Sequence, residues 1–251
     1  MPWNPFKRDA PPSQPSPGNL PAREEIPAKK DSSQEIDIIK LESEMRTPLF
    51  TEAVIRAFIE LVRNLGDKLA TYDTILSDDA SGRLVSLVLR KVINEARKRK
   101  GMGGGQIYFL ASGKHGKKDI MLAIENFLKS KKPGIQKALL VTEHIASGNS
   151  IREMATILNN VGLDFDVATL SMYDKLYQYS SFFDNIELYF GKEESIAGAD
   201  FYKKPQYSGV EKGISDDPLP HPTKRPDINY RRITQARKDV RRLAEALKKL
   251  I

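Results

Sequence analysis

One stretch of the sequence, residues 139–150, reads LLVTEHIASGNS and is typical of a strand that runs into a helix. Three apolar residues are followed by Thr142 and the acid Glu143; the small residues Ala146, Ser147 and Gly148 come after His144 and Ile145, and the hydroxyl residue Ser150 follows Asn149. Apolar residues then recur at helical spacing: Ile151, Met154, Ala155, Leu158 and Val161. Gly162 is a typical helix end. The stretch therefore predicts the turn of a β–α unit.

The same alternation occurs on both sides of this stretch. Strands are expected at Tyr72–Ser77, Ile107–Leu110, Ala138–Thr142, Val167–Ser171 and Ile186–Phe190, and helices at Leu84–Lys98, 119–130 and 151–161. Strands that alternate with helices predict an α/β fold, a Rossmann-like parallel sheet flanked by helices. Ligands of such sheets bind at the carboxyl ends of the strands. Three loops should lie there: 78–83, 111–118 and 143–150.

The chain divides into three parts by composition. Residues 1–34 contain eight of the fifteen prolines, which predicts a disordered arm. Residues 35–210 form the expected α/β domain, whose first long helix should begin after Thr47 as cap with Pro48 in its first turn. Residues 211–251 are expected to be an extended loop and a basic amphipathic helix. The apolar seam of that helix is Ile233, Ala236, Val240, Leu243, Leu247 and Leu250.

The positive charge of the chain is concentrated at its C-terminus. The sequence has 40 Lys and Arg against 33 Asp and Glu, a net charge of +7. Residues 224–251 hold ten of the basic and three of the acidic residues, so the rest is neutral overall. The terminal helix could contact nucleic-acid phosphates, could form a coiled-coil dimer stem, or could pack on the domain with its charges in water.

Several classes of protein are excluded or disfavoured by composition. The chain has no cysteine, which excludes disulfide scaffolds, thiolate metal sites and thiol nucleophiles. With only three histidines (His115, His144 and His221), a multi-histidine metal site is not expected. The sequence predicts no side chain as a metal ligand. No apolar run is long enough for a membrane helix. The N-terminus lacks the apolar core of a signal peptide. We therefore expect a cytoplasmic protein.

The loop after residue 142 has the features of a phosphate-binding cup. Gly148 allows a close approach of the backbone, the amides at the helix start favour an anion, and Ser147 and Ser150 add hydroxyl donors. Glu143, at the strand end, could hold sugar hydroxyls. A plain N-capped helix after a buried strand fits the same residues.

The stretch resembles the signature of the type I phosphoribosyltransferases. Residues 139–141 are its apolar lead, Thr142 and Glu143 occupy its acidic pair, and Ser147, Gly148 and Ser150 match the rest without a gap. Thr142 departs from the pattern, which has an acid there. The order and approximate spacing of the elements agree over residues 48–210.

The resemblance implies binding of 5-phosphoribosyl-1-pyrophosphate (PRPP) with Mg²⁺, and transfer of the phosphoribosyl group to a nitrogenous base with release of pyrophosphate. Glu143 and Thr142 would hold the ribose as the catalytic pair. The remaining roles would be divided as follows: Ala146, Ser147, Gly148, Asn149 and Ser150 for the 5′-phosphate, Ala80, Ser81, Gly82, Arg83, Lys114 and Lys117 for pyrophosphate, and Tyr189, Phe201 and Tyr202 for the base. A homodimer is also implied.

Three alternatives stay open at this stage. The missing acid at Thr142 predicts weak or absent turnover with an intact phosphate cup. Residues 111–117, ASGKHGK, match a loose P-loop pattern for a nucleoside triphosphate, although Lys118 replaces its usual Ser or Thr. The fold could also serve assembly or nucleic-acid regulation through its basic helix.

Overall fold

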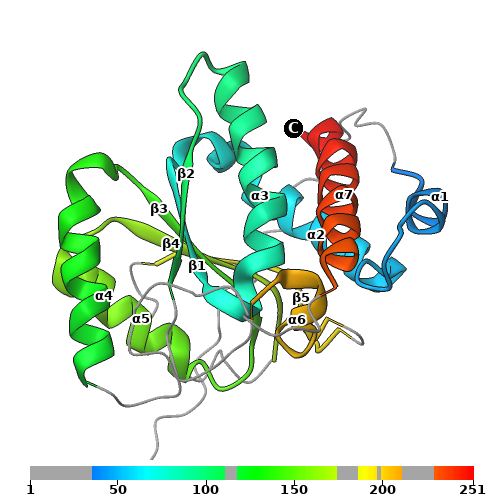
Figure 1. Cartoon of the computed structure of the whole chain (residues 1–251). Helices are drawn as coiled ribbons and strands as arrows, with labels where there is room; N and C mark the ends of the chain where they lie inside the picture. Colours follow the sequence, from blue (N-terminus) through cyan, green and yellow to red (C-terminus); the bar gives the residue numbers. More distant parts are fainter. Residues whose placement is uncertain (1–35, 111–117, 174–185, 197–198, 211–228) are drawn as a thin grey trace, which may run out of the picture. The chain divides into compact units, whose positions relative to one another are not determined.

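A parallel β-sheet forms the centre of the computed structural model, which describes residues 36–110, 118–173, 186–196, 199–210 and 229–251 (Figure 1). In these residues the sheet has five strands in the order β2-β1-β3-β4-β5, and every neighbouring pair is parallel. The strands are β1 (Thr74–Asp78), β2 (Gln106–Leu110), β3 (Ala138–Ile145), β4 (Phe165–Met172) and β5 (Leu188–Lys192). The expected α/β fold with a parallel sheet is thus confirmed.

Helices cover both faces of this sheet. One face carries α2 (Glu52–Leu65), α3 (Asp79–Arg99) and α7 (Tyr230–Leu247), and the other carries α4 (Lys118–Lys131) and α5 (Asn149–Val161) (Figure 1). Side chains alternate along a strand, so β3 contributes to two cores: Leu139 and Val141 pack with α2 and α3, and Leu140 packs with α4 and α5.

The remaining helical elements of the described residues are short. They are α1 (Ile38–Ser43), α6 (Pro205–Ser208), and 3₁₀ turns at Gly66–Thr71, Lys132–Gly134, Phe201–Lys203 and Lys248–Leu250. The helix expected after Thr47 begins later, at Glu52, with the hydroxyl of Thr51 accepting a hydrogen bond from the amide of Val54. Thr47 is not a cap because its hydroxyl donates to the buried carboxylate of Asp239, at 2.7 Å.

Two boundaries near the carboxyl edge of the sheet differ from the sequence prediction. The expected loop at 78–83 is wrong: α3 begins at Asp79, directly after β1. A Cβ added to Gly82 would lie 2.4 Å from the carbonyl oxygen of Val141, so this glycine lets the helix start against β3. Strand β3 also continues past Thr142 to Ile145, because His144 and Ile145 remain paired with β4.

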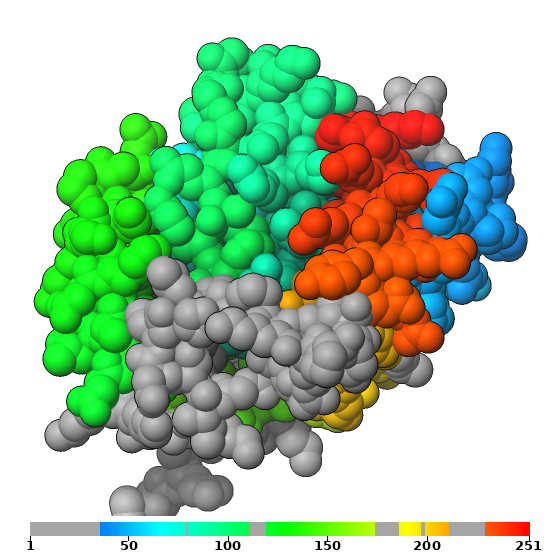
Figure 2. All heavy atoms as spheres, viewed as in Figure 1, coloured from blue at the N-terminus to red at the C-terminus, as the bar shows by residue number. Residues whose placement is uncertain are grey.

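The terminal helix packs on the domain. Five seam residues of α7 are buried, namely Ile233, Ala236, Val240, Leu243 and Leu247, while Leu250 is half-buried. Figure 2 shows α7 beside α3 on one face of the molecule. The buried carboxylate of Asp239 accepts hydrogen bonds from the amide of Arg46 and the hydroxyl of Thr47. The seam is therefore used within the chain, and an expected homodimer would need another surface.

Some expectations lie outside the described residues. These are the arm at 1–34, the loop at 111–117 with Lys114 and Lys117, and most of the extended loop from residue 211. Within the ranges given above, no helix combines the length and the apolar character needed to cross a bilayer.

Candidate functional site

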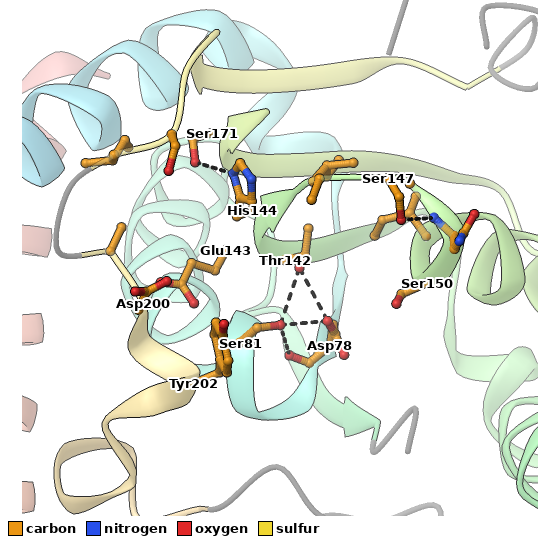
Figure 3. A pocket seen from close by; sticks show the side chains of 18 residues that line it. Asp78, Ser81, Thr142, Glu143, His144, Ser147, Ser150, Ser171, Asp200 and Tyr202 are labelled. Carbon is orange, nitrogen blue, oxygen red and sulfur yellow. Dashed lines mark hydrogen bonds between the residues drawn. The ribbon is translucent and has the colours of Figure 1, made fainter. Parts of the chain in front are cut away.

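A cavity of about 270 Å³ opens at the carboxyl ends of β1, β3 and β4. In a sheet of this strand order, ligands bind where the chain reverses direction across the sheet, here between β1 and β3. The cavity is lined by Asp78 and Ser81, by residues 142–151, by Ser171, and by part of the segment 195–202 (Figure 3). Two of the three expected loop positions thus contribute to one site, and the third lies outside the described residues.

The first part of the site is the start of α5. Gly148 precedes this helix with a φ of 72°, a left-handed conformation that glycine adopts without strain. It opens a 13-residue helix whose first amides and dipole favour an anion. Ala146, Ser147, Asn149 and Ser150 line the cavity around it, as the phosphate-cup prediction requires.

Arg152 adds a positive charge to this helix start. It is not among the site residues that the sequence predicted. Its guanidinium donates to the carbonyl oxygen of Ser147 at 3.3 Å and to the side-chain oxygen of Asn149. Its position four residues after Gly148, on the exposed side of a first helical turn, is the signal that could have identified it. The cup is therefore cross-linked by a cation.

The second part of the site joins the end of β1 to the middle of β3. The parallel register pairs Ser77 with Val141, so the next residues, Asp78 and Thr142, also lie side by side. One carboxylate oxygen of Asp78 accepts a hydrogen bond from the Ser81 hydroxyl at 2.6 Å and one from the Thr142 hydroxyl at 3.4 Å (Figure 3). The sequence predicted a loop at 78–83 with binding residues at 80–83, and Asp78 was not among the predicted site residues.

The third part is the carboxyl of Glu143, which is 2% exposed. One of its oxygens accepts a hydrogen bond from the amide of Phe201 at 2.6 Å, and the other has no partner among the described residues. Burial raises the pKa of Glu143 to about 8, against the opposing effect of the amides of Phe201 and Tyr202. The neighbouring carboxylate of Asp200 raises this pKa further. At neutral pH the group is mainly a neutral acid that can donate a hydrogen bond.

His144 and Ser171 line the cavity on a further side. Ring nitrogen Nδ1 of His144 lies 2.8 Å from the hydroxyl oxygen of Ser171, and the imidazole meets the Tyr173 ring edge-on at 5.0 Å between centroids. Burial lowers the pKa of His144 from its ordinary value, which favours the neutral ring at pH 7. Both side chains thus offer polar atoms to the cavity.

The three aromatic candidates for base binding are in different surroundings. Tyr202 lines the cavity. The Phe201 ring is fully buried, 6.1 Å from the ring of Phe50, so it belongs to the core. Tyr189 lies on β5, where its hydroxyl bonds to Glu187, and it is not among the residues that line the cavity. Of these three aromatic residues, Tyr202 alone lines the cavity.

The residues predicted for pyrophosphate also separate. Ser81 lines the cavity, whereas Ala80 is buried and Gly82 packs on β3. The Arg83 guanidinium lies 4.0 Å from the centroid of the Phe109 ring, and Arg83 is not part of the cavity lining. These residues belong to the first turns of α3, so the predicted pyrophosphate loop is the start of a helix.

A cation-binding site built from protein side chains alone is not present in the described part of the chain, where no three His, Cys, Asp or Glu residues converge. The carboxyl and hydroxyl groups of the cavity nevertheless offer oxygen atoms, which Mg²⁺ prefers. Mg²⁺ is commonly held by one or two carboxylates together with the phosphates of a substrate. Asp78 and its hydroxyl neighbours fit an ion that arrives with a ligand.

Comparison with known proteins adds no assignment. No model of a protein family matches the chain, and a search of curated proteins finds no match either.

Proposed function

We propose that this protein binds PRPP or a related phosphoribosyl ligand together with Mg²⁺. One observation carries the proposal: the open helix start at Gly148 and the buried, half-satisfied carboxyl of Glu143 line the same cavity. A sugar phosphate combines the anion that suits the first with the hydroxyl groups that suit the second.

The roles of the residues follow from their chemistry. The amides and hydroxyls of 146–150 would hold the 5′-phosphate, and Glu143 would bond to a ribose hydroxyl. Asp78, held by Ser81 and Thr142, would face the Mg²⁺, whose charge would offset that of the pyrophosphate. Tyr202 would stack on a base. Each group orients the ligand in a partly closed cavity, which is the main contribution that this type of transfer asks of a protein.

The associated reaction is transfer of the phosphoribosyl group to a nitrogenous base with release of pyrophosphate. We propose ligand binding as the primary property and expect slow turnover, because Thr142 provides no carboxylate for the ribose. The acceptor base would enter beside Tyr202.

Isothermal titration with PRPP and Mg²⁺ tests the binding. We expect heat from the wild-type chain and a loss of affinity of about tenfold in Ser150→Ala, because a hydroxyl bonded to a phosphate contributes roughly 1.5 kcal/mol. Ser130→Ala is the matched control, since its hydroxyl bonds to the Phe127 carbonyl oxygen on α4, outside the cavity. Absence of binding, or equal affinities for all three proteins, contradicts the proposal.

A second candidate is a catalytically inactive protein that binds nucleic acid through α7. The observation that favours it is a set of exposed cations on this helix: Arg231, Arg232, Arg237, Lys238 and Arg241. Affinity for a DNA or RNA oligonucleotide should then fall steeply with salt. It should fall further in the double variant Arg237→Ala, Lys238→Ala, while PRPP binding stays unchanged. No oligonucleotide binding at low salt removes this candidate.

A further inference from the structure

We propose that Asp78, at the end of β1, is the carboxylate that holds the divalent cation of the bound ligand, and that Thr142, which stands where the phosphoribosyltransferase signature has an acid, orients this carboxylate. The inference rests on the proposed function and names a binding residue for it. Its basis is a cluster of three oxygen-bearing side chains, Asp78, Ser81 and Thr142, that meet inside the cavity.

The backbone explains why these side chains meet. Because β1 and β3 are parallel neighbours in register at Ser77 and Val141, Asp78 and Thr142 emerge next to each other at the carboxyl edge. The immediate start of α3 then brings Ser81 within 3.4 Å of Thr142. Three elements therefore converge on one carboxylate.

The hydroxyls hold this carboxylate in place. Both Ser81 and Thr142 donate to the same oxygen of Asp78, at 2.6 Å and 3.4 Å. Hydrogen bonds of this kind restrict the rotation of the side chain and keep its charge directed into the cavity. A fixed carboxylate beside an anion-binding helix start is the arrangement that a phosphate-borne cation needs.

The same geometry explains the threonine. An aspartate at 142 would place a second carboxylate where the Thr142 hydroxyl now lies, 3.4 Å from an oxygen of Asp78. Two carboxylates at that separation disfavour each other's charged forms. A hydroxyl at 142 instead donates to Asp78. Threonine at 142 and aspartate at 78 are thus complementary, and we expect each to tolerate change poorly without a change in the other.

Glu143 does not provide an alternative ligand at this place. Successive residues of a strand point to opposite faces; accordingly, Glu143 bonds to the amide of Phe201, whereas Thr142 bonds to Asp78. The two carboxyls of the cavity therefore serve different parts of a ligand.

Titration calorimetry with PRPP, with and without Mg²⁺, tests the assignment on four proteins: wild type, Asp78→Asn, Thr142→Asp, and the double variant Asp78→Asn, Thr142→Asp. We expect Asp78→Asn to lose at least tenfold in affinity with Mg²⁺ and less than threefold without it. The double variant should recover most of the Mg²⁺-dependent affinity, because it moves the carboxylate from β1 to β3. Thr142→Asp alone should bind more weakly than wild type.

Asp164→Asn serves as the control, because Asp164 precedes β4 at the opposite edge of the sheet with a side chain that is 67% exposed. Melting temperatures report whether each variant is folded, and the double variant retains a test if Asp78→Asn alone does not fold. If the wild type binds PRPP with Mg²⁺ and Asp78→Asn has the same affinity, this inference is overturned, while the proposed function stands. Wild type that does not bind PRPP under either condition would overturn the proposed function and this inference together.

Discussion

Two strand-to-helix turns border the cavity, and they differ although their sequences look alike. The turn at 78–83 and the turn at 145–150 each contain small residues, serine and one glycine. In the first, the helix starts directly after the strand and Gly82 lies against the Val141 carbonyl. In the second, three residues intervene and Gly148 adopts a left-handed conformation. The second turn thus contributes backbone and hydroxyl groups of residues 146–150 to the cavity lining, while the first contributes two side chains, those of Asp78 and Ser81.

The largest expected effect comes from Gly82→Ala. The added methyl group would lie 2.4 Å from the Val141 carbonyl oxygen and 3.0 Å from the Ser77 hydroxyl, so α3 would have to move away from β3. We expect a loss of about 3 kcal/mol in the free energy of unfolding, as for other overpacked sites, measured by urea denaturation. A stability equal to that of wild type would show that this turn is a loose loop after all.

Glu143→Gln tests the buried acid of the cavity. The folded-state pKa of about 8 lies above the ordinary value of 4.5, so the folded wild type is penalised as pH rises from 4.5 towards 8. The penalty grows by at most about 1.4 kcal/mol per pH unit. Glutamine does not ionise and so avoids this penalty, but burying its polar amide also costs free energy.

We therefore expect Glu143→Gln to be more stable than wild type by about 2 kcal/mol at pH 8, and less stable than wild type near pH 4, where the carboxyl is neutral in both states and the pH-independent cost of burying glutamine remains. Urea denaturation at a series of pH values measures it. A difference independent of pH would mean that Glu143 is not held in its neutral form.

Gly148→Ala should have a smaller effect on stability and a larger one on ligand binding. A side chain in the left-handed conformation costs about 1–2 kcal/mol, and relaxation of that turn would displace the amides of the cup. We expect PRPP affinity to fall at least tenfold, whereas folded Gly82→Ala should bind more nearly as wild type does. The reverse ranking of the two glycine variants in calorimetry would place the phosphate at the other turn.

Ser81→Ala should have the smallest effect. It removes the 2.6 Å hydrogen bond to Asp78, and we expect a loss of about 1 kcal/mol or less in stability. Mg²⁺-dependent affinity should fall less than in Asp78→Asn, because the carboxylate stays but is less firmly oriented. A loss as large as that of Asp78→Asn would indicate that the hydroxyl itself touches the ligand.

The elements of the fold were readable from the sequence because their signals are local. Apolar runs such as 138–141 and the helical spacing after Ile151 predict strand and helix without reference to the rest of the chain. The cavity-lining turn at 146–150 was predicted for the same reason, since glycine and hydroxyl residues between a strand and a helix form a contiguous pattern. The strand ends were less accurate, because hydrogen bonds with β4 extend β3 to Ile145.

Contacts between distant residues were not readable in this way. Phe201 was predicted to bind a base, yet its ring lies in the core against Phe50. Asp78 was not predicted as a site residue. Its place beside Thr142, 64 positions later in the chain, depends on the register of β1 and β3. The seam of α7 was equally compatible with a dimer, and its burial against the domain settles its use within this chain.

By itself, the sequence determined the α/β class, the order of strands and helices, and the stretch 139–150 as the centre of the candidate site. The hydrophobic periodicity and the positions of glycines are patterns of a few consecutive residues, so they can be recognised in the sequence. The tertiary structure alone decided that the helix begins at Asp79, directly after β1, and that Asp78 lies beside Thr142. It also decided that Glu143 is buried with one oxygen that has no partner among the described residues. Burial and strand register are properties of the packed sheet, in which neighbours come from distant parts of the chain.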